Sequence, residues 1–182
     1  ASGVIDAVLT GSGGLTKNNT GQLSLMRVSN YGGGTTVAAG VLRVNGAIVG
    51  PVSVSSGATL GGDGAAGDAS LAGAAMLSPG NGIGAFRLGS LSLAGDATIL
   101  FQLTDARGVA GVGYDTIVVS GALSLSRVSA TGRVGLKVST LPGMTDGAAG
   151  TPLSFDAHKR HSFSLIKYGS LELGAGGNIA DL

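Results

Sequence analysis

The chain has 182 residues, enough for one substantial hydrophobic core, and its length does not require a second domain. Its 11 Lys and Arg nearly balance its 10 Asp and Glu, and apart from one short cluster these charges stand singly, so there is no basic stripe to follow a nucleic-acid backbone. The 35 glycines show no Gly-X-Y period, which excludes collagen, and 43% hydrophobic residues with 12% charged residues exclude intrinsic disorder.

The sequence contains no cysteine, which fits a cytosolic protein and equally an exported one that crosses an envelope without disulfides. No stretch approaches the ~18 consecutive apolar residues of a membrane span, and no charged-then-apolar leader opens the chain. We therefore expect no membrane insertion by this segment, and we expect any export signal to lie outside it.

Short runs that alternate apolar with small or polar side chains recur along the chain, separated by glycine clusters. This period of two predicts strands with one buried face, and the glycines predict tight turns between them. The predicted strands are residues 23–25, 41–44, 58–60, 75–77, 91–93, 117–119 and 123–125. After about residue 126, we expect strands at 134–138 and 163–166 and a long polar excursion over 142–161.

A glycine followed by an apolar alternating pair returns at Gly21, Gly40, Gly57, Gly73, Gly95 and Gly121. The spacings, by subtraction, are 19, 17, 16, 22 and 26 residues. An imperfect period near ~20 residues predicts a solenoid, and the lack of an Asn-containing consensus and of a helical return segment argues against leucine-rich repeats. We therefore predict an all-β fold, a single parallel β-helix (β-solenoid) of about eight coils.

A longer motif covers residues 11–44 and comprises Leu15-Thr16-Lys17, Gly21, Leu23-Ser24-Leu25, Tyr31, residues 33–37, Gly40 and Leu42-Arg43-Val44. It resembles the autotransporter-associated β-strand repeat, and residues 56–64, 77–81, 93–96 and 114–121 continue the likeness over roughly residues 10–125. The resemblance implies a right-handed parallel β-helix in the passenger region of a large bacterial protein, secreted or anchored at the outer membrane. Arg27 and Ser29 stand where that family has glycine and asparagine, so we expect an altered turn there.

Several residues invite a catalytic or metal-binding interpretation. Asp63, Asp68, Asp96, Asp105 and Asp115 are conceivable carboxylates of a β-helical glycosidase or lyase, but they would have to share one face, and most adjoin glycine, where Asp stabilises turns. Residues 61–66 resemble a calcium nonapeptide, yet the sixth position is Ala66 and one copy is present, so a glycine-rich turn is favoured.

His158-Lys159-Arg160-His161 is the one charge cluster, and it has no third metal ligand nearby in the sequence, so a solvated loop is favoured over a metal or anionic-glycan site. No Gly-x-Ser-x-Gly elbow is present, and the sequon at 18–20 is explained as a turn. We therefore assign no catalytic, metal or cofactor residue and predict no enzymatic activity.

Three functions remain open: a stalk or passenger segment that nucleates folding after export, an adhesin or filament subunit that binds a glycan, a protein or itself, and a β-helical carbohydrate-active enzyme. An exposed aromatic row would favour glycan binding, and a carboxylate cluster in a cleft would favour the enzyme. We predict one domain over residues 1–182, located outside the cell or on its surface, whose residues 126–182 continue the helix and cap its C-terminal end.

An open end of a solenoid exposes unpaired strand edges and an apolar core. Residues 1–10 form a strand-bearing coil without a polar cap ahead of it, so we expect an open N-terminal end with self-association through Val4, Ile5, Val8 and Leu9. Residues 162–173 are apolar enough to fold over the last coil and close the opposite end.

Overall fold

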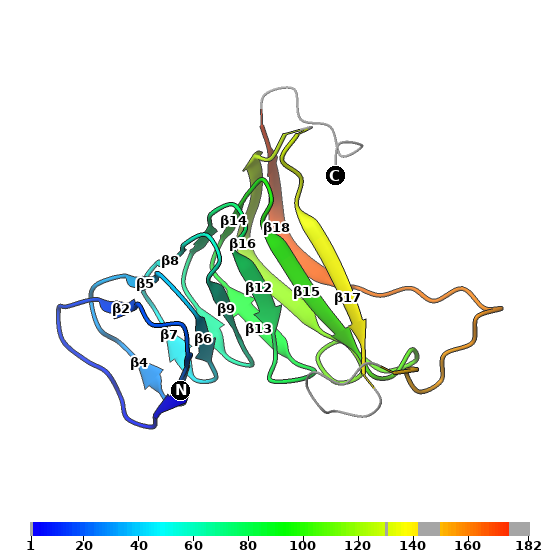
Figure 1. Cartoon of the computed structure of the whole chain (residues 1–182), viewed down its shortest axis with the longest axis horizontal. Coiled ribbons are helices and arrows are strands. Elements are labelled where there is room, and N and C mark those ends of the chain that lie inside the picture. The colour runs from blue at the N-terminus through cyan, green and yellow to red at the C-terminus, as the bar shows by residue number, and fades with distance from the viewer. Residues whose placement is uncertain (1, 130, 142–149, 175–182) are drawn as a thin grey trace.

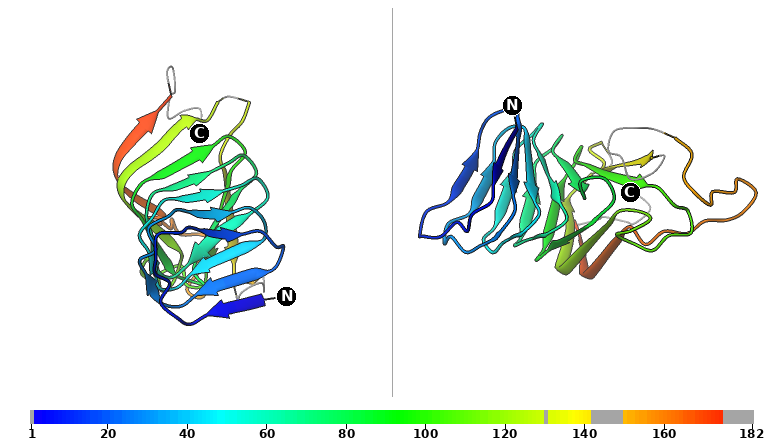
Figure 2. Two further views of the ribbon diagram at one scale, coloured as in Figure 1. Left: turned by 90° about the vertical axis from the view of Figure 1, so that its left-hand side faces the viewer. Right: turned by 90° about the horizontal axis from the view of Figure 1, so that it is seen from below.

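The computed structural model describes residues 2–129, 131–141 and 150–174, and within them every regular element is a β-strand (Figure 1). Each pairing between two strands is parallel. The described part of the chain is thus a parallel β-helix whose coils stack from the N-terminal to the C-terminal side (Figure 2). The predicted all-β, β-solenoid fold is confirmed.

The coils have three faces. Face 1 is a 7-stranded sheet of β1 (Ser2–Ile5), β3 (Gln22–Leu25), β6 (Val41–Val44), β9 (Thr59–Gly62), β12 (Met76–Pro79), β15 (Thr98–Leu103) and β17 (Gly135–Thr140). Face 2 comprises β4 (Val28–Ser29), β7 (Ala47–Ile48), β10 (Ala65–Ala66) and β13 (Ala85–Leu88). Face 3 comprises β2 (Leu15–Lys17), β5 (Thr35–Val37), β8 (Val52–Val54), β11 (Ala69–Leu71) and β14 (Leu91–Ala94). The long strand β16 (Thr116–Arg127) pairs with both β13 and β14 and joins faces 2 and 3, and β18 (Ile166–Leu173) lies along it.

The described residues form seven coils, one for each face 1 strand, close to the expectation of about eight for the whole chain. Residues paired along face 1, from Ser2 through Gln22, Val41, Thr59, Met76 and Thr98 to Gly135, advance by subtraction by 20, 19, 18, 17, 22 and 37 residues. The last advance is long because this coil contains the 104–115 loop and the 12-residue β16.

The glycines that recur in the sequence mark the turn that leads from face 3 into each face 1 strand. Backbone φ is positive at Gly40 (69°), Gly57 (76°), Ala74 (59°) and Asp96 (67°), all just ahead of such strands. Gly121 does not belong to this series, because it lies inside β16 at the corner between faces 2 and 3, where its N–H donates to the Gly89 carbonyl at 2.7 Å. The recurring glycine therefore marks the corner between face 3 and face 1, whereas Gly121 marks the corner between faces 2 and 3.

Inward side chains stack in rows along the axis and form one continuous core. One row runs Leu42, Leu60, Leu77 and Ile99, and each of these side chains has no exposed surface. Because burial of one such side chain contributes about 1.5–3 kcal/mol, each coil is stabilised mainly by its two neighbours.

The predicted strands fall mostly on face 1, and the short strands of the other faces were largely missed. Residues 23–25, 41–44, 58–60 and 75–77 match β3, β6, β9 and β12, residues 91–93 match β14, and 117–119 with 123–125 are two parts of β16. Strands such as β4, β7 and β10 have two residues each, too few to show an alternating pattern.

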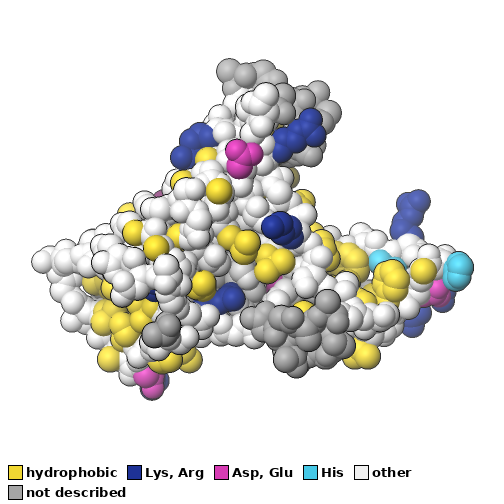
Figure 3. All heavy atoms as spheres, viewed as in Figure 1, with side chains coloured by type: hydrophobic (Ala, Val, Ile, Leu, Met, Phe, Trp, Pro, Cys, Tyr) yellow, Lys and Arg dark blue, Asp and Glu magenta, His cyan; other side chains and the backbone are white. Residues whose placement is uncertain are grey.

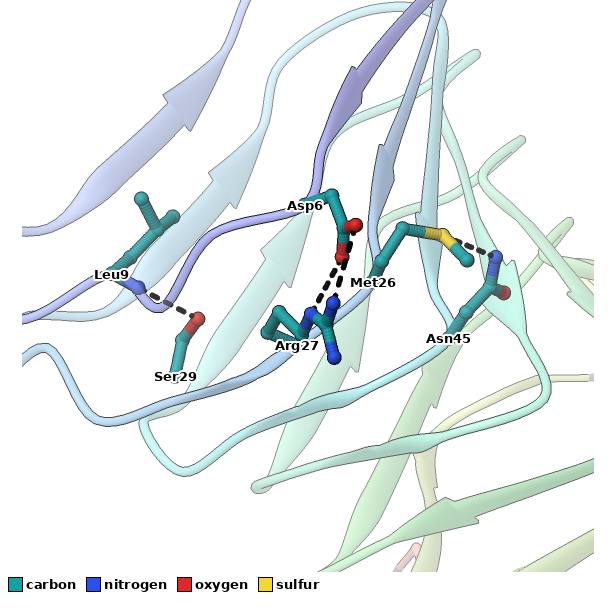
Figure 4. A network of polar contacts seen from close by, with 6 residues as sticks. All are labelled: Asp6, Leu9, Met26, Arg27, Ser29 and Asn45. Carbon is teal, nitrogen blue, oxygen red and sulfur yellow. Dashed lines mark hydrogen bonds and ion pairs between the residues drawn. The ribbon is translucent and has the colours of Figure 1, made fainter.

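Arg27 and Ser29, where an altered turn is expected, lie at the junction between the first two coils (Figure 4). Ser29 belongs to β4, is 1% exposed, and its Oγ accepts a hydrogen bond from the Leu9 N–H at 3.1 Å. The Arg27 Nε lies 2.6 Å from a carboxylate oxygen of Asp6. The hydroxyl therefore supplies at this position a hydrogen-bond acceptor for the preceding coil.

The C-terminal region departs from expectation. The strand predicted at 134–138 is present as β17, but β18 begins at Ile166 and is a further strand of the sheet, so residues 162–173 do not fold over the last coil as a cap. The free backbone groups along the edge of β16 explain this, because a parallel neighbour satisfies them and a covering loop would not. Of the predicted excursion, residues 142–149 lie outside the described residues, and residues 150–161 contain no strand.

Candidate functional site

Two of the five aspartates considered above meet at one corner of the β-helix, between faces 1 and 2. Asp63 follows β9, and Asp115 immediately precedes β16. Gly84 separates the two carboxylates: its N–H donates to Asp115 Oδ1 at 2.8 Å, and a Cβ at this position would lie 1.8 Å from Asp63 Oδ1. The fold thus brings together two acidic groups that are 52 residues apart by subtraction.

Asp115 is fully buried and joins two successive coils. Its carboxylate accepts a hydrogen bond from the Gly84 N–H and, at 2.7 Å, another from the Gln102 N–H. Burial raises the pKa of Asp115 to about 7, although both backbone N–H groups and Arg43 lower it, while Asp63 raises it further. A carboxyl without exposed surface cannot contact a substrate in this conformation, so the geometry makes Asp115 an acceptor that holds the backbone.

Arg43 reaches from β6 across one whole coil. Its Nη1 donates to the carbonyls of Ser78 at 2.8 Å and Gly80 at 2.6 Å in the coil after next. Gly61 lies between them, and a Cβ there would be 2.7 Å from Arg43 Nη1 and 1.9 Å from the Ser78 carbonyl oxygen. Residues 61–66, considered above as a calcium motif, therefore form the end of β9, a turn and β10, and Gly61 provides the space for the arginine side chain.

Asp63 lies in the same electrostatic environment. Partial burial raises its pKa, while a hydrogen bond from the Asn81 backbone and the Arg43 charge lower it. The Asn45 side-chain oxygen accepts from the Asn81 side-chain amide at 3.0 Å, so this corner is a polar network over three coils.

The other three aspartates lie apart from this corner. Asp68 Oδ1 accepts from the Ser90 N–H at 2.7 Å in the next coil, and Asp105 Oδ1 accepts from the Arg107 N–H at 3.0 Å within its own loop. Asp96 occupies a turn with positive φ. The turn role predicted for aspartates is observed at Asp105, and Asp68 and Asp115 instead connect coils.

A second candidate site lies on the excursion between β17 and β18. Phe155 and His161 stack with ring centroids 5.2 Å apart, His161 and Phe163 stack at 6.4 Å, and Tyr114 meets Phe163 edge-on at 5.1 Å. The rings come from the 104–115 loop and the excursion, which projects beyond the coil stack (Figure 1). The protrusion at the right of Figure 3 carries histidine and basic side chains beside hydrophobic ones.

The outer surface of face 3 carries a row of hydroxyl groups. The residues in register are Thr16, Thr36, Ser53, Ser70, Ser92 and Ser124, followed by Glu172. Arg127 donates to Ser70 Oγ at 2.9 Å and to Ser92 Oγ at 3.2 Å. A shallow groove of about 440 Å³ follows this row. The row gives the face a polar surface with few charges.

Lys17 is a buried side chain that sequence reasoning missed. It occupies an inward position in β2, in register with Val37, and its Nζ donates to the carbonyls of Asn19 and Ala39, at 3.0 Å for Ala39. Asn18, Asn19 and Thr20 of the sequon form the exposed turn after it. The signal in the sequence is a lysine at an apolar position of the alternating pattern.

Across the described ranges, no three His, Asp or Glu side chains gather closely enough to hold a metal ion. Nor does that part of the chain contain a helix long and apolar enough to cross a membrane.

Comparison with known proteins relates part of the chain to part of a secreted protein. The described fold is of the parallel β-helix class, and no protein-family model matches the chain. Over 76 residues, 42% of its length, the chain is 40% identical to an extracellular serine protease of Serratia marcescens. The chain covers 7% of that protein. Part of the chain thus resembles part of a secreted protein.

Proposed function

We propose that this chain is a structural segment of a secreted or surface-exposed bacterial protein, a passenger-type β-helix that acts as a stalk. The coil stack is the observation that carries the proposal, because strand pairing along face 1 continues from β1 to β17 over seven strands. Adjacent strands lie ~4.8 Å apart, so seven coils extend a polypeptide by about 30 Å. The length of such a stack therefore increases with the number of coils.

The comparison and the acidic corner support the same function. A match covering 7% of an extracellular protease is what a recurring scaffold module would produce in a large secreted protein. The resemblance to the autotransporter-associated β-strand repeat favours a bacterial passenger. We propose no enzymatic activity, since the more enzyme-like carboxylate, Asp115, is buried and engaged by two backbone N–H groups.

Removal of one coil in register tests the stalk. Deletion of residues 59–75 joins Ala58 to Met76 and places β12 beside β6, because Val41 pairs with Thr59 and Thr59 pairs with Met76. The variant should remain folded by circular dichroism and shorten by ~4.8 Å, and two additional copies of this segment should lengthen the particle by ~10 Å in small-angle X-ray scattering.

The matched control deletes residues 59–68, which removes β9 and β10 but leaves β11 without its coil. This control should lose stability sharply. Unfolding of the in-register deletion, or an unchanged length after coil insertion, would contradict the stalk.

A second candidate function, binding of an anionic polysaccharide, rests on the excursion. Phe155 is 49% exposed at one end of the ring stack, and His158, Lys159 and Arg160 follow it in the sequence. Lys159 pairs with Asp156 at 3.3 Å, which leaves this tip with a net positive charge. An aromatic face beside cationic groups fits a negatively charged sugar ring.

Binding of heparin compared with neutral dextran tests this second function. The wild type should bind heparin in a salt-dependent manner, and Phe155→Ala and Arg160→Gln should each weaken binding several-fold. Val49→Ala, at an exposed position away from the excursion, is the control. Equal heparin binding by all four proteins would refute the site.

A further inference from the structure

Two Asn-Gly dipeptides lie at the corner between faces 1 and 2, two coils apart. Asn45-Gly46 follows β6 and Asn81-Gly82 follows β12, with Asp63-Gly64 at the same place in the coil between them. An asparagine before glycine can lose its side-chain amide spontaneously, because glycine has no side chain to hinder attack by its backbone nitrogen on the asparagine Cγ. The two dipeptides are chemically identical, so a difference in their reactivity must come from the fold.

The fold holds the first dipeptide firmly. The Gly46 N–H donates to the Leu25 carbonyl of the preceding coil at 3.0 Å, and a Cβ at Gly46 would lie 2.3 Å from the Arg27 carbonyl carbon. The Asn45 side-chain amide donates to Met26 Sδ at 3.4 Å (Figure 4). The nitrogen that would have to attack Asn45 is therefore hydrogen-bonded and packed against the neighbouring coil.

The second dipeptide is held less firmly. Gly82 lies in a bend with φ 106°, between Gly80, whose φ is 74°, and Gly84. Within the described residues, the Gly82 N–H donates to no protein group. Gly82 is buried, but Asn81 is exposed, and its side-chain amide donates to Asn45 Oδ1 at 3.0 Å. The attacking nitrogen is therefore not engaged, and water reaches the side chain under attack.

We propose that Asn81 is a site of spontaneous deamidation in the folded protein, that Asn45 is protected from it, and that conversion of Asn81 weakens this corner. The Gly82 nitrogen gives its proton to hydroxide and attacks Asn81 Cγ, and the side-chain amide leaves as ammonia. Water then opens the cyclic succinimide to aspartate or to isoaspartate. No atom is oxidised or reduced, and water is the co-reactant.

The product would be less well accommodated than asparagine. An aspartate at position 81 places a hydrogen-bond acceptor where the amide now donates to Asn45 Oδ1. It also adds a negative charge beside Asp63, whose carboxylate accepts a hydrogen bond from the Asn81 backbone, and two carboxylates at one site repel each other. Isoaspartate in addition lengthens the main chain by a methylene group and so distorts the turn. The modified protein should therefore melt at a lower temperature than fresh protein.

Ageing the whole chain in mildly alkaline buffer tests the site. Trypsin releases both dipeptides in one peptide, residues 44–87, and its fragment ions in mass spectrometry assign deamidation to either asparagine. In the folded protein, Asn81 should convert at least about tenfold faster than Asn45, because the Gly46 N–H must first leave its hydrogen bond. In urea, where the fold is lost, the two asparagines should convert at similar rates.

Two variants separate this modification from general ageing. Asn81→Gln keeps the amide but cyclises slowly because its side chain is longer, so its melting temperature should not change with age. Asn81→Asp imitates one product and should melt below fresh wild type, as aged wild type should. The proposal would be overturned by equal conversion of both asparagines in the folded protein or by an unmodified Asn81 under conditions that convert it in urea. An Asn81→Asp variant as stable as wild type would overturn it as well.

Discussion

The buried carboxyl of Asp115 should make the stability of this β-helix depend on pH, and Asp115→Asn should remove that dependence. Burial raises the pKa of Asp115 from 3.8 to about 7 in the folded protein. The folded state thus binds the proton more tightly than the unfolded state does. The stability linked to this proton is fully present below pH 3.8 and is lost as the pH rises through about 7.

The size of the effect follows from the two pKa values. The difference between 3.8 and about 7, at ~1.36 kcal/mol per pKa unit, corresponds to about 4 kcal/mol. For a protein of this length, about 4 kcal/mol lowers the melting temperature by roughly 10 °C. Asparagine cannot accept both backbone N–H groups, so the variant should be less stable than wild type at pH 5 by about 1–3 kcal/mol. That deficit should shrink or reverse by pH 8.

Thermal unfolding of both proteins from pH 4.5 to 8.5, followed by circular dichroism, measures the difference. Subtracting the two curves removes titrations that the proteins share. Asp68→Asn is a control for loss of a carboxylate that accepts one backbone N–H from the next coil. If the wild-type and Asp115→Asn melting temperatures run parallel over this range, the reasoning about Asp115 is refuted.

Three further substitutions test the local geometry by chemical unfolding. Ala74→Gly should stabilise by about 0.5–1 kcal/mol, because Ala74 has φ 59°, where a Cβ costs ~1–2 kcal/mol, and a loss of stability would contradict this. Gly61→Ala should destabilise by about 1–3 kcal/mol, since the new Cβ collides with the Ser78 carbonyl, and an unchanged midpoint would show that no space is needed there. Ser29→Ala should cost about 1 kcal/mol by removing the acceptor of the Leu9 N–H, whereas the conservative Ser29→Thr should retain most of it.

The alternating pattern predicted the fold class because it depends on local chemistry. Runs such as Val41–Val44 show which side chains face the core, and the recurring glycine ahead of them marks the turn into face 1. The two-residue strand β4 has no such signal. It forms because β7 pairs with its backbone and because the Leu9 N–H donates a hydrogen bond to the Ser29 side chain. The period predicts coil number only approximately, because loops between coils change the period without changing the stack.

Only the tertiary structure decided which distant residues meet. Spacing in the chain does not indicate that Asp63 and Asp115 share a corner, or that Arg43 passes Gly61 to reach Ser78. The sequence showed that residues 162–173 are apolar, but it did not show whether they form a cap or a strand, because the same side chains suit both. The free edge of β16 selected the strand, since each backbone group paired there would otherwise stay unsatisfied. The alternating pattern of a segment determines which of its side chains are buried. Which strand edges pair and which charged groups meet is determined only when the coils assemble.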